Sequence, residues 1–187
     1  MKTRHIITWI LILVFTDQII KILINIYIGN VHFEIIPTLI EFKPTFNERH
    51  SWVNNLLDDN FGINVGLIPH VILYILIGIF LPMYFSYFRN NILADKKLID
   101  IAIICLMAGV LCALIGNIIW QKGTLDYIYL KPLFVFDLKD MYCDLGTITF
   151  LIYVFKNRNQ FEILAKGMKL RDVYLETKDR LKEIKNK

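Results

Sequence analysis

The chain has 187 residues, of which 56% are hydrophobic, and its formal net charge is a modest +4. Its mean hydropathy of +0.49 and its long, unbroken apolar blocks exclude an ordinary soluble globular domain, whose apolar residues would recur with helical or strand periodicity. The three cysteines have no paired spacing and therefore predict no disulfide framework.

Four apolar stretches are long enough to cross about 30 Å of hydrocarbon as helices. They run over residues 6–28, 65–88, 98–120 and 141–155, and the last of them is short. We therefore predict an all-α membrane protein with four transmembrane helices in a domain formed by residues 1–158. The first stretch is interpreted as an uncleaved span, because it contains Asp17 and Lys21 and no small-residue cleavage site follows it.

Two segments outside these spans have patterns of their own. The first loop, residues 29–64, is too long for a simple turn, and its part 39–46 alternates weakly and contains Pro44. This predicts a short, edge-like strand pair lying on the membrane. Residues 159–187 form a basic tail, which we expect to be an amphipathic helix on the inner membrane surface; a solvated tail is the alternative. The apolar face of that helix would carry Phe161, Leu164, Met168 and Leu175.

The charges of the connections indicate the orientation. The N-terminus carries Lys2 and Arg4, the connection between the second and third spans sums to +2, and residues 156–187 hold ten basic and five acidic residues. The loop 29–64 sums to −3, and residues 121–140 hold three charges of each sign. The positive-inside rule therefore places both termini in the cytoplasm and these two loops outside.

Asp17 and Lys21 are charged residues inside the first predicted span. They lie four residues apart and so share one face of the helix. Each charge near the membrane centre costs on the order of 2.5–3.5 kcal/mol, which argues for pairing or for a role facing the interior of the bundle. The pair either pins the helix to its neighbours or supports a functional site.

Asp126 and Asp140 form a second pair of acidic residues, one after the third span and one at the start of the fourth. Two carboxyls close together in a low-dielectric site cannot both ionise, so one of them keeps a proton. Such a pair supplies a base that activates water and an acid that protonates a leaving amine, as peptide hydrolysis requires. The alternative is two ordinary carboxylates at the membrane interface.

Gly116 and Asn117 lie near the outer end of the third span. A glycine permits close approach of another element, and an amide inside a membrane requires a hydrogen-bond partner. Asn117 could bond a carboxylate or the backbone of a substrate, or it could only hold two helices together.

These pieces, in this order, resemble the lipoprotein signal peptidase family, the type II signal peptidases of bacteria. The stretch from Asp17 to Lys21 is similar to the D-Q-x-x-K motif of that family, and Gly116-Asn117 is similar to the start of its G-N-x-x-D-R motif. Asn47 stands where the family has the asparagine of its N-x-G-A-A-F segment. The resemblance extends from the first span to the fourth and leaves out the tail.

The two aspartates of the outer end also match motifs of the family. Asp126 lies in a stretch similar to V-D-F-I, and Asp140 ends a stretch similar to F-N-x-A-D. The resemblance implies that Asp126 and Asp140 are the catalytic dyad and that nearby polar residues support them. The supporting residues that it implies are Asn117, Asn47, Asp17, Lys21 and Gly116.

The resemblance also implies an activity and a location. An aspartic endopeptidase of this type removes signal peptides from diacylglyceryl-modified prolipoproteins at the outer face of the bacterial cell (inner) membrane, without a metal or cofactor. Its partners would be membrane lipids and these substrates, and we expect a monomer. Nucleic-acid binding has no support in the sequence. The four histidines are scattered, so they predict no metal site.

Several positions depart from the patterns of the family. No D-R pair follows Asn117, and the residues after Asn47 are not small. Asp137 replaces an asparagine, Lys139 replaces a small residue, and Asp144 adds a carboxylate. Added negative charge around Asp140 disfavours its ionisation, with Lys139 as an offset.

Two alternatives therefore stand beside a divergent peptidase. One is an altered or inactive relative that binds lipopeptides or membrane partners without cutting them. The other is an ion or proton carrier, since acidic residues inside a membrane also mark such paths.

Overall fold

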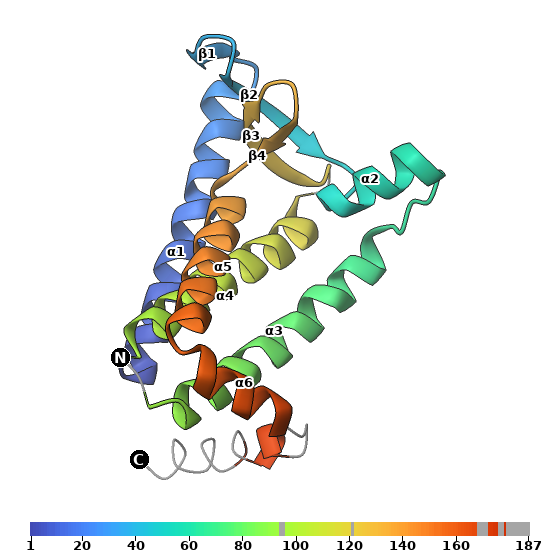
Figure 1. The fold of residues 1–187 in the computed structure, drawn as a ribbon. Coiled ribbons are helices and arrows are strands. Elements are labelled where there is room, and N and C mark those ends of the chain that lie inside the picture. Colours follow the sequence, from blue (N-terminus) through green and yellow to red (C-terminus); the bar gives the residue numbers. More distant parts are fainter. Residues whose placement is uncertain (94–95, 121, 168–171, 176–177, 179–187) are drawn as a thin grey trace.

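The computed structural model describes residues 1–93, 96–120, 122–167, 172–175 and 178. Six α-helices and four strands make up the described chain (Figure 1). The helices are α1 (Thr3–Leu23), α2 (Trp52–Phe61), α3 (Leu67–Asn91), α4 (Lys97–Ile119), α5 (Leu138–Lys156) and α6 (Arg158–Gly167). The strands are β1 (Phe33–Ile36), β2 (Ile40–Asn47), β3 (Thr124–Leu130) and β4 (Phe134–Phe136).

Three helices have the length and apolar composition that crossing a membrane requires. They are α1, which continues as a π-helical turn to Ile28, together with α3 and α4. The protein is therefore a membrane protein, as its composition predicts. Helix α5 has 19 residues and carries Lys139, Asp140 and Asp144 in its first two turns. It is not among the three candidate spans, so a fourth crossing stays a prediction.

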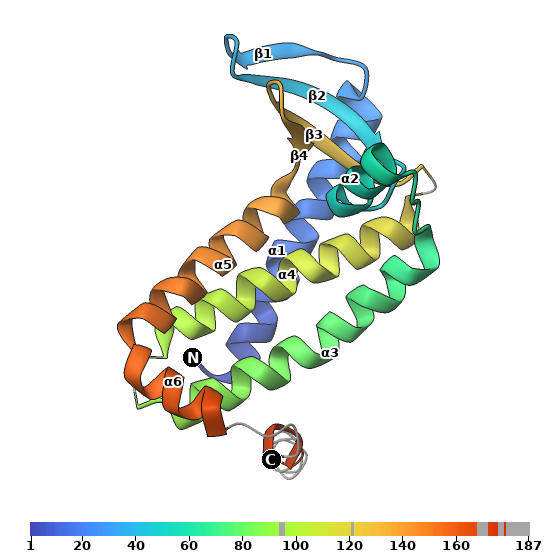
Figure 2. The ribbon, with the colours of Figure 1, turned by 45° about the vertical axis from the view of Figure 1, so that its right-hand side comes forward.

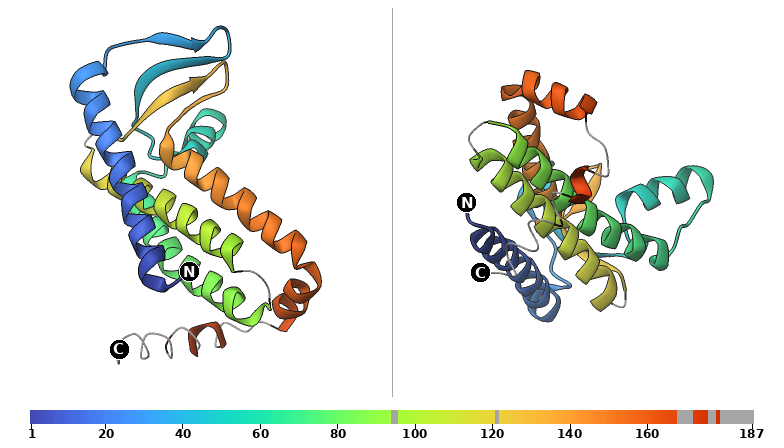
Figure 3. Two further views of the ribbon diagram at one scale, coloured as in Figure 1. Left: turned by 90° about the vertical axis from the view of Figure 1, so that its left-hand side faces the viewer. Right: turned by 90° about the horizontal axis from the view of Figure 1, so that it is seen from below.

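Helix α4 is the centre of the bundle. It contacts α1, α3 and α5, and Figures 2 and 3 show it between these neighbours. Its contact with α5 is close because each helix contributes a glycine: a Cβ on Gly109 would collide with Cys143, and a Cβ on Gly146 would lie 2.7 Å from the side chain of Leu106. Small residues allow helices in a membrane to approach in this way.

A four-stranded antiparallel sheet in the order β1-β2-β3-β4 lies at one end of the bundle. The first loop does form a strand pair, but residues 39–46 supply only β2, and β1 comes from the residues before them. Strands β3 and β4 come from the later loop and were not predicted. The interpretation of residues 39–46 as an edge was wrong, because β2 is paired on both sides. Pro44 is tolerated there because the register of β2 against β3 shifts between Phe42 and Thr45, where a proline need not donate a ladder hydrogen bond.

An apolar cluster holds the sheet on the C-terminal end of α1. Ile24 of the π-helical turn packs with Phe42 of β2 and with Leu125 and Tyr127 of β3. Successive residues of a strand point to opposite faces, so this packing directs Thr124 and Asp126 to the other face of β3. All four residues at the start of β3 are buried.

The N-terminus and α6 lie at the opposite end of the bundle from the sheet (Figure 1). Here Arg89 of α3 forms an ion pair with the fully buried Asp100 of α4. The first part of the amphipathic helix predicted for residues 159–187 is present as α6, and Phe161 stacks on Phe88 at 4.3 Å between ring centroids. The apolar face of α6 thus packs against the protein itself. Of the residues predicted on that face, Leu175 is exposed and Met168 lies outside the described residues.

Candidate active site

Asp126 is held at the centre of the sheet. It follows Leu125 in β3, pairs in register with Thr45 of β2, and is 4% exposed. Because Leu125 is fixed in the apolar cluster on α1, the side chain of Asp126 points the other way, toward the start of α5. Its Oδ2 atom accepts a hydrogen bond of 3.4 Å from the Nδ2 atom of Asn47, the last residue of β2.

Asp137 and Asp140 form the N-terminal cap of α5. The Asp137 carboxylate accepts a hydrogen bond of 3.2 Å from the backbone N–H of Asp140, and Asp140 Oδ2 accepts one of 3.1 Å from the backbone N–H of Asp137. This reciprocal arrangement is a capping box, which stabilises the first turn of a helix. It also fixes the direction of the Asp140 carboxyl relative to β3.

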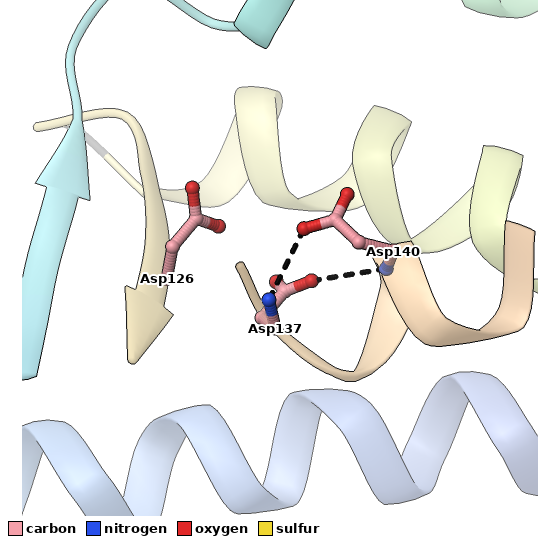
Figure 4. A group of neighbouring side chains, drawn as sticks. All are labelled: Asp126, Asp137 and Asp140. Carbon is pink, nitrogen blue, oxygen red and sulfur yellow. Dashed lines mark hydrogen bonds between the residues drawn. The ribbon is translucent and has the colours of Figure 1, made fainter. Parts of the chain in front are cut away.

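The cap brings Asp140 opposite Asp126. Figure 4 shows the two carboxyls facing each other from α5 and β3, with Asp137 beside them. One carboxylate oxygen from each of the three aspartates lies within 4.8 Å of the others. The Asp140 side chain is 43% exposed, whereas Asp137 is fully buried.

The Lys139 ammonium group lies among these three carboxylates. Its Nζ atom is 2.8 Å from Asp126 Oδ1, 2.9 Å from Asp137 Oδ2 and 3.3 Å from Asp140 Oδ2. Three carboxylates at this spacing offer the oxygen ligands that a hard cation prefers. The ammonium of Lys139 already occupies that position, so the residues present fit a tethered cation and not a metal centre.

Asp17 and Lys21 connect α1 to the same cluster. Lys21 Nζ is 2.9 Å from Asp17 Oδ2 and 2.6 Å from Asp137 Oδ2, and all three side chains are fully buried. The local pair expected from the spacing of Asp17 and Lys21 is therefore confirmed. The second ion pair, between Lys21 and Asp137, connects α1 to the N-cap residue of α5.

The electrostatic surroundings shift the pKa values of Asp126 and Asp137 in opposite directions. Burial raises the pKa of Asp126 above its ordinary value, and the adjacent Lys139 opposes this shift without cancelling it. Burial acts in the same direction on Asp137, but Lys139 and Lys21 together hold the pKa of that carboxyl below its ordinary value. Relative to an ordinary aspartate, the surroundings thus favour the charged form of Asp137 and the protonated form of Asp126.

Gly116 and Asn117 contact residues next to the candidate dyad and not the dyad itself. A Cβ on Gly116 would lie 2.7 Å from the Cγ2 atom of Thr124, so the glycine permits β3 to begin close against α4. Asn117 donates to the Ala113 carbonyl of its own helix, and its Oδ1 atom lies 2.9 Å from Nδ1 of His50. Among the bonds of the described residues, none joins Asn117 to either candidate catalytic aspartate.

Two hydrogen-bonded pairs, each containing a histidine, fix the loop that follows Asn47. His50 adopts a positive φ of 69° and bonds Asn117, while Ser51 caps α2 and lies 2.8 Å from Nε2 of His70. Sequence patterns did not predict these contacts. The one sequence signal in this stretch was that the residues after Asn47 are not small, in contrast to the N-x-G-A-A-F segment of the family. Lys139 was noted as a departure, but its position among the carboxylates was not foreseen.

Comparisons with known proteins show similarity in sequence pattern and in fold. The family model for signal peptidase II (SPase II) matches residues 9–156. A bacterial membrane enzyme structure obtained by the in meso method at 2.3 Å resolution has a TM-score of 0.60 and 22% identity, covering 84% of this chain and 91% of its own. A second one at 1.9 Å has the same TM-score and identity, covering 83% and 96%.

Identity at this level shows a shared fold, and no curated protein matches the sequence. The match to the family model, however, covers most of the chain and includes α1, the sheet, α4 and α5. On that ground, the chain belongs to the signal peptidase II family.

Proposed function

We propose that the protein is an aspartic endopeptidase that removes signal peptides from lipid-modified prolipoproteins at the outer face of the membrane. The observation that carries the proposal is the pair of carboxyls of Asp126 and Asp140, which face each other from β3 and α5 within 4.8 Å. Membership of the signal peptidase II family supports the reaction type. The substrate class, the roles of these residues and the orientation in the membrane are parts of the proposal.

The two carboxyls differ in the way that hydrolysis requires. We assign the proton to Asp126, which is 4% exposed, and the role of the base to Asp140, whose side chain is 43% exposed. Asp140 takes a proton from water as the water oxygen forms a bond to the scissile carbonyl carbon, and Asp126 donates its proton to the carbonyl oxygen. When the C–N bond breaks, the proton on Asp140 moves to the leaving nitrogen and the carbonyl oxygen returns its proton to Asp126.

The location of the site suits a substrate that enters from the membrane. The candidate dyad lies at the sheet end of the bundle, where the apolar helices α1 and α4 end. The balance of basic residues supports a position of this end outside the cytoplasm and of both termini inside. We infer an inner-membrane protein of bacteria whose partners are membrane lipids and diacylglyceryl-modified prolipoproteins, and which acts as a monomer.

Processing of a prolipoprotein tests the proposal. The wild-type chain is expressed in bacteria depleted of their own signal peptidase II, and the purified protein is assayed in lipid vesicles on a diacylglyceryl-modified peptide. Asp126→Asn and Asp140→Asn should each lower cleavage by at least about 100-fold. In Asp140→Asn the amide oxygen can still accept the hydrogen bond from the backbone N–H of Asp137, so the loss would come from the missing base. In Asp126→Asn it would come from the missing proton donor.

Asp144→Asn is the matched control, because Asp144 is an exposed carboxylate in the same helix. Its cleavage rate should stay near that of the wild type. Absence of processing by the wild type, or full processing by Asp126→Asn, would contradict the catalytic assignment.

A second candidate function is the binding of lipopeptides without cleavage. It is favoured by the Lys139 ammonium, which contacts both aspartates at 2.8 and 3.3 Å, where a catalytic water would otherwise bind. The same vesicles separate the two functions. Retention of the lipopeptide by the wild type and by Asp126→Asn, with no cleavage by either protein, would support binding alone.

A further inference from the structure

Asp137 and Lys139 introduce opposite charges into the candidate site at positions two residues apart. Both depart from the F-N-x-A-D pattern that the rest of this stretch resembles. The structure places them in direct contact, with 2.9 Å between Lys139 Nζ and Asp137 Oδ2. Asp137 is fully buried and Lys139 is 9% exposed, so solvent screens neither charge effectively.

The charges of the cluster can be assigned in pairs. Lys21 lies between Asp17 and Asp137, and Lys139 lies between Asp137 and the two candidate catalytic residues. Two ammonium groups therefore face four carboxylates. If Lys21 balances Asp17 and Lys139 balances Asp137, the remaining pair carries one shared proton and one negative charge, as an aspartic dyad requires.

We propose that Asp137 and Lys139 form a compensating ion pair that sets the protonation of the candidate dyad, with Lys139 as a positioning residue. Lys139 contacts Asp126 and Asp140 directly, and Asp137 neutralises the charge that Lys139 would otherwise impose on them. The kinetic test of this role rests on the proposed peptidase activity, because it requires cleavage. Its spectroscopic readout does not depend on cleavage.

Other titratable groups surround the pair. The charged ones are Asp17 and Lys21 of α1, Asp126 of β3 and Asp140 of α5. The uncharged ones are Tyr74 of α3, Cys112 of α4, Tyr127 of β3, and Tyr142 and Cys143 of α5. Phenols and thiols are neutral near pH 7, so the charged groups dominate the field at the dyad.

The compensation predicts opposite effects of two single substitutions. Asp137→Asn removes a negative charge near Asp126 and should lower the pKa of Asp126. Lys139→Met removes the positive charge and should raise that pKa. A charge in direct contact shifts a carboxyl by about one pH unit or more, and the double variant should return to within a few tenths of the wild type.

The substitutions are chosen to preserve the structure. Asparagine caps a helix as well as aspartate does, so α5 keeps its first turn in Asp137→Asn. Methionine keeps the length and packing of the lysine stem. Lys139→Arg retains the charge and is the conservative control, which should titrate as the wild type does.

Infrared titration of the carboxyl C=O band measures the protonation of Asp126 in the full chain, reconstituted in lipid vesicles. The band is assigned by its loss in Asp126→Asn. Opposite shifts in the single variants, with cancellation in the double variant, are the expected result. Shifts of both singles in one direction, or a double variant that keeps the whole shift of either single, would overturn the proposal.

The pH profile of peptide cleavage provides the second readout. Its alkaline limb should move to lower pH in Asp137→Asn and to higher pH in Lys139→Met by the same amounts as the infrared titration. A profile that stays in place in every variant while the infrared band shifts would overturn the role of the pair in the dyad. If the wild type cleaves at no pH, the proposed function fails, and the infrared titration alone decides whether the pair compensates.

Discussion

Replacing Lys21 with methionine measures how much the buried ion pairs contribute to stability. The Nζ atom of Lys21 lies 2.9 Å from Asp17 Oδ2 and 2.6 Å from Asp137 Oδ2, and all three side chains are fully buried. At an effective dielectric constant of about 20, each charge pair at this separation attracts by about 6 kcal/mol. This attraction offsets the desolvation of the ions, so its loss leaves two buried carboxylates without that ammonium.

We expect Lys21→Met to lower the free energy of unfolding by about 3–5 kcal/mol, the usual cost of removing one partner of a buried pair. The loss should shrink at acidic pH, because a carboxyl that takes up a proton no longer requires the ammonium. Titration with SDS in mixed micelles, followed by circular dichroism at neutral and acidic pH, measures both effects.

Lys122→Met is the control, since Lys122 is an exposed lysine and its replacement should change stability by no more than about 0.5 kcal/mol. A loss below about 1 kcal/mol for Lys21→Met, or a loss that is equal at both pH values, would refute the assignment of Lys21 as the ion-pair partner of Asp17 and Asp137.

Three further predictions concern separate parts of the molecule. Gly116→Ala should lower cleavage by about tenfold or more, because its Cβ would lie 2.7 Å from Thr124 Cγ2. Thr124→Ser removes that methyl group and should restore most of the rate in the double variant, which kinetics of both variants will show. Phe161→Ala removes the stacking on Phe88 and should destabilise α6 by about 2–4 kcal/mol. Faster amide hydrogen exchange in α6 with unchanged cleavage is the readout, and unchanged exchange would contradict it. Burial raises the pKa of Asp126, so its protonated form persists to higher pH. The alkaline limb of the pH profile of kcat/KM should therefore lie above the pH range in which an ordinary aspartate titrates. Loss of activity already near pH 4 would contradict this direction of the shift.

The features that could be predicted from the sequence depend on residues close together in the chain. The apolar length of α1, α3 and α4 predicts spans without any knowledge of their neighbours, because lipid contact requires an uninterrupted apolar segment. The pairing of Asp17 with Lys21 follows from helical spacing alone. The amphipathic pattern of α6 was visible for the same reason, although the surface it covers was not.

The sheet depended on pairing across distant parts of the chain. β2 and β3 are separated by α2, α3 and α4 in the sequence, and β3 had been interpreted as a plain loop. The sequence of β3 alternates polar and apolar residues only from Thr124 to Tyr127 and is apolar or aromatic from there to Leu130, which is too short an alternation to identify a strand, although all four of the first residues are buried in the structure. The position of Asp126 within the sheet therefore could not be derived from its surrounding residues.

The sequence by itself determined that this protein enters a membrane and which acidic residues are candidates for chemistry, since hydropathy and motif order are properties of the chain alone. Only the tertiary structure decided which charges meet. Lys21 of α1 reaches Asp137 before α5, and Lys139 stands between Asp126 and Asp140. Ionisation in a buried cluster depends on distances of a few ångströms between segments far apart in sequence, and those distances exist only after α1, β3 and α5 have packed together.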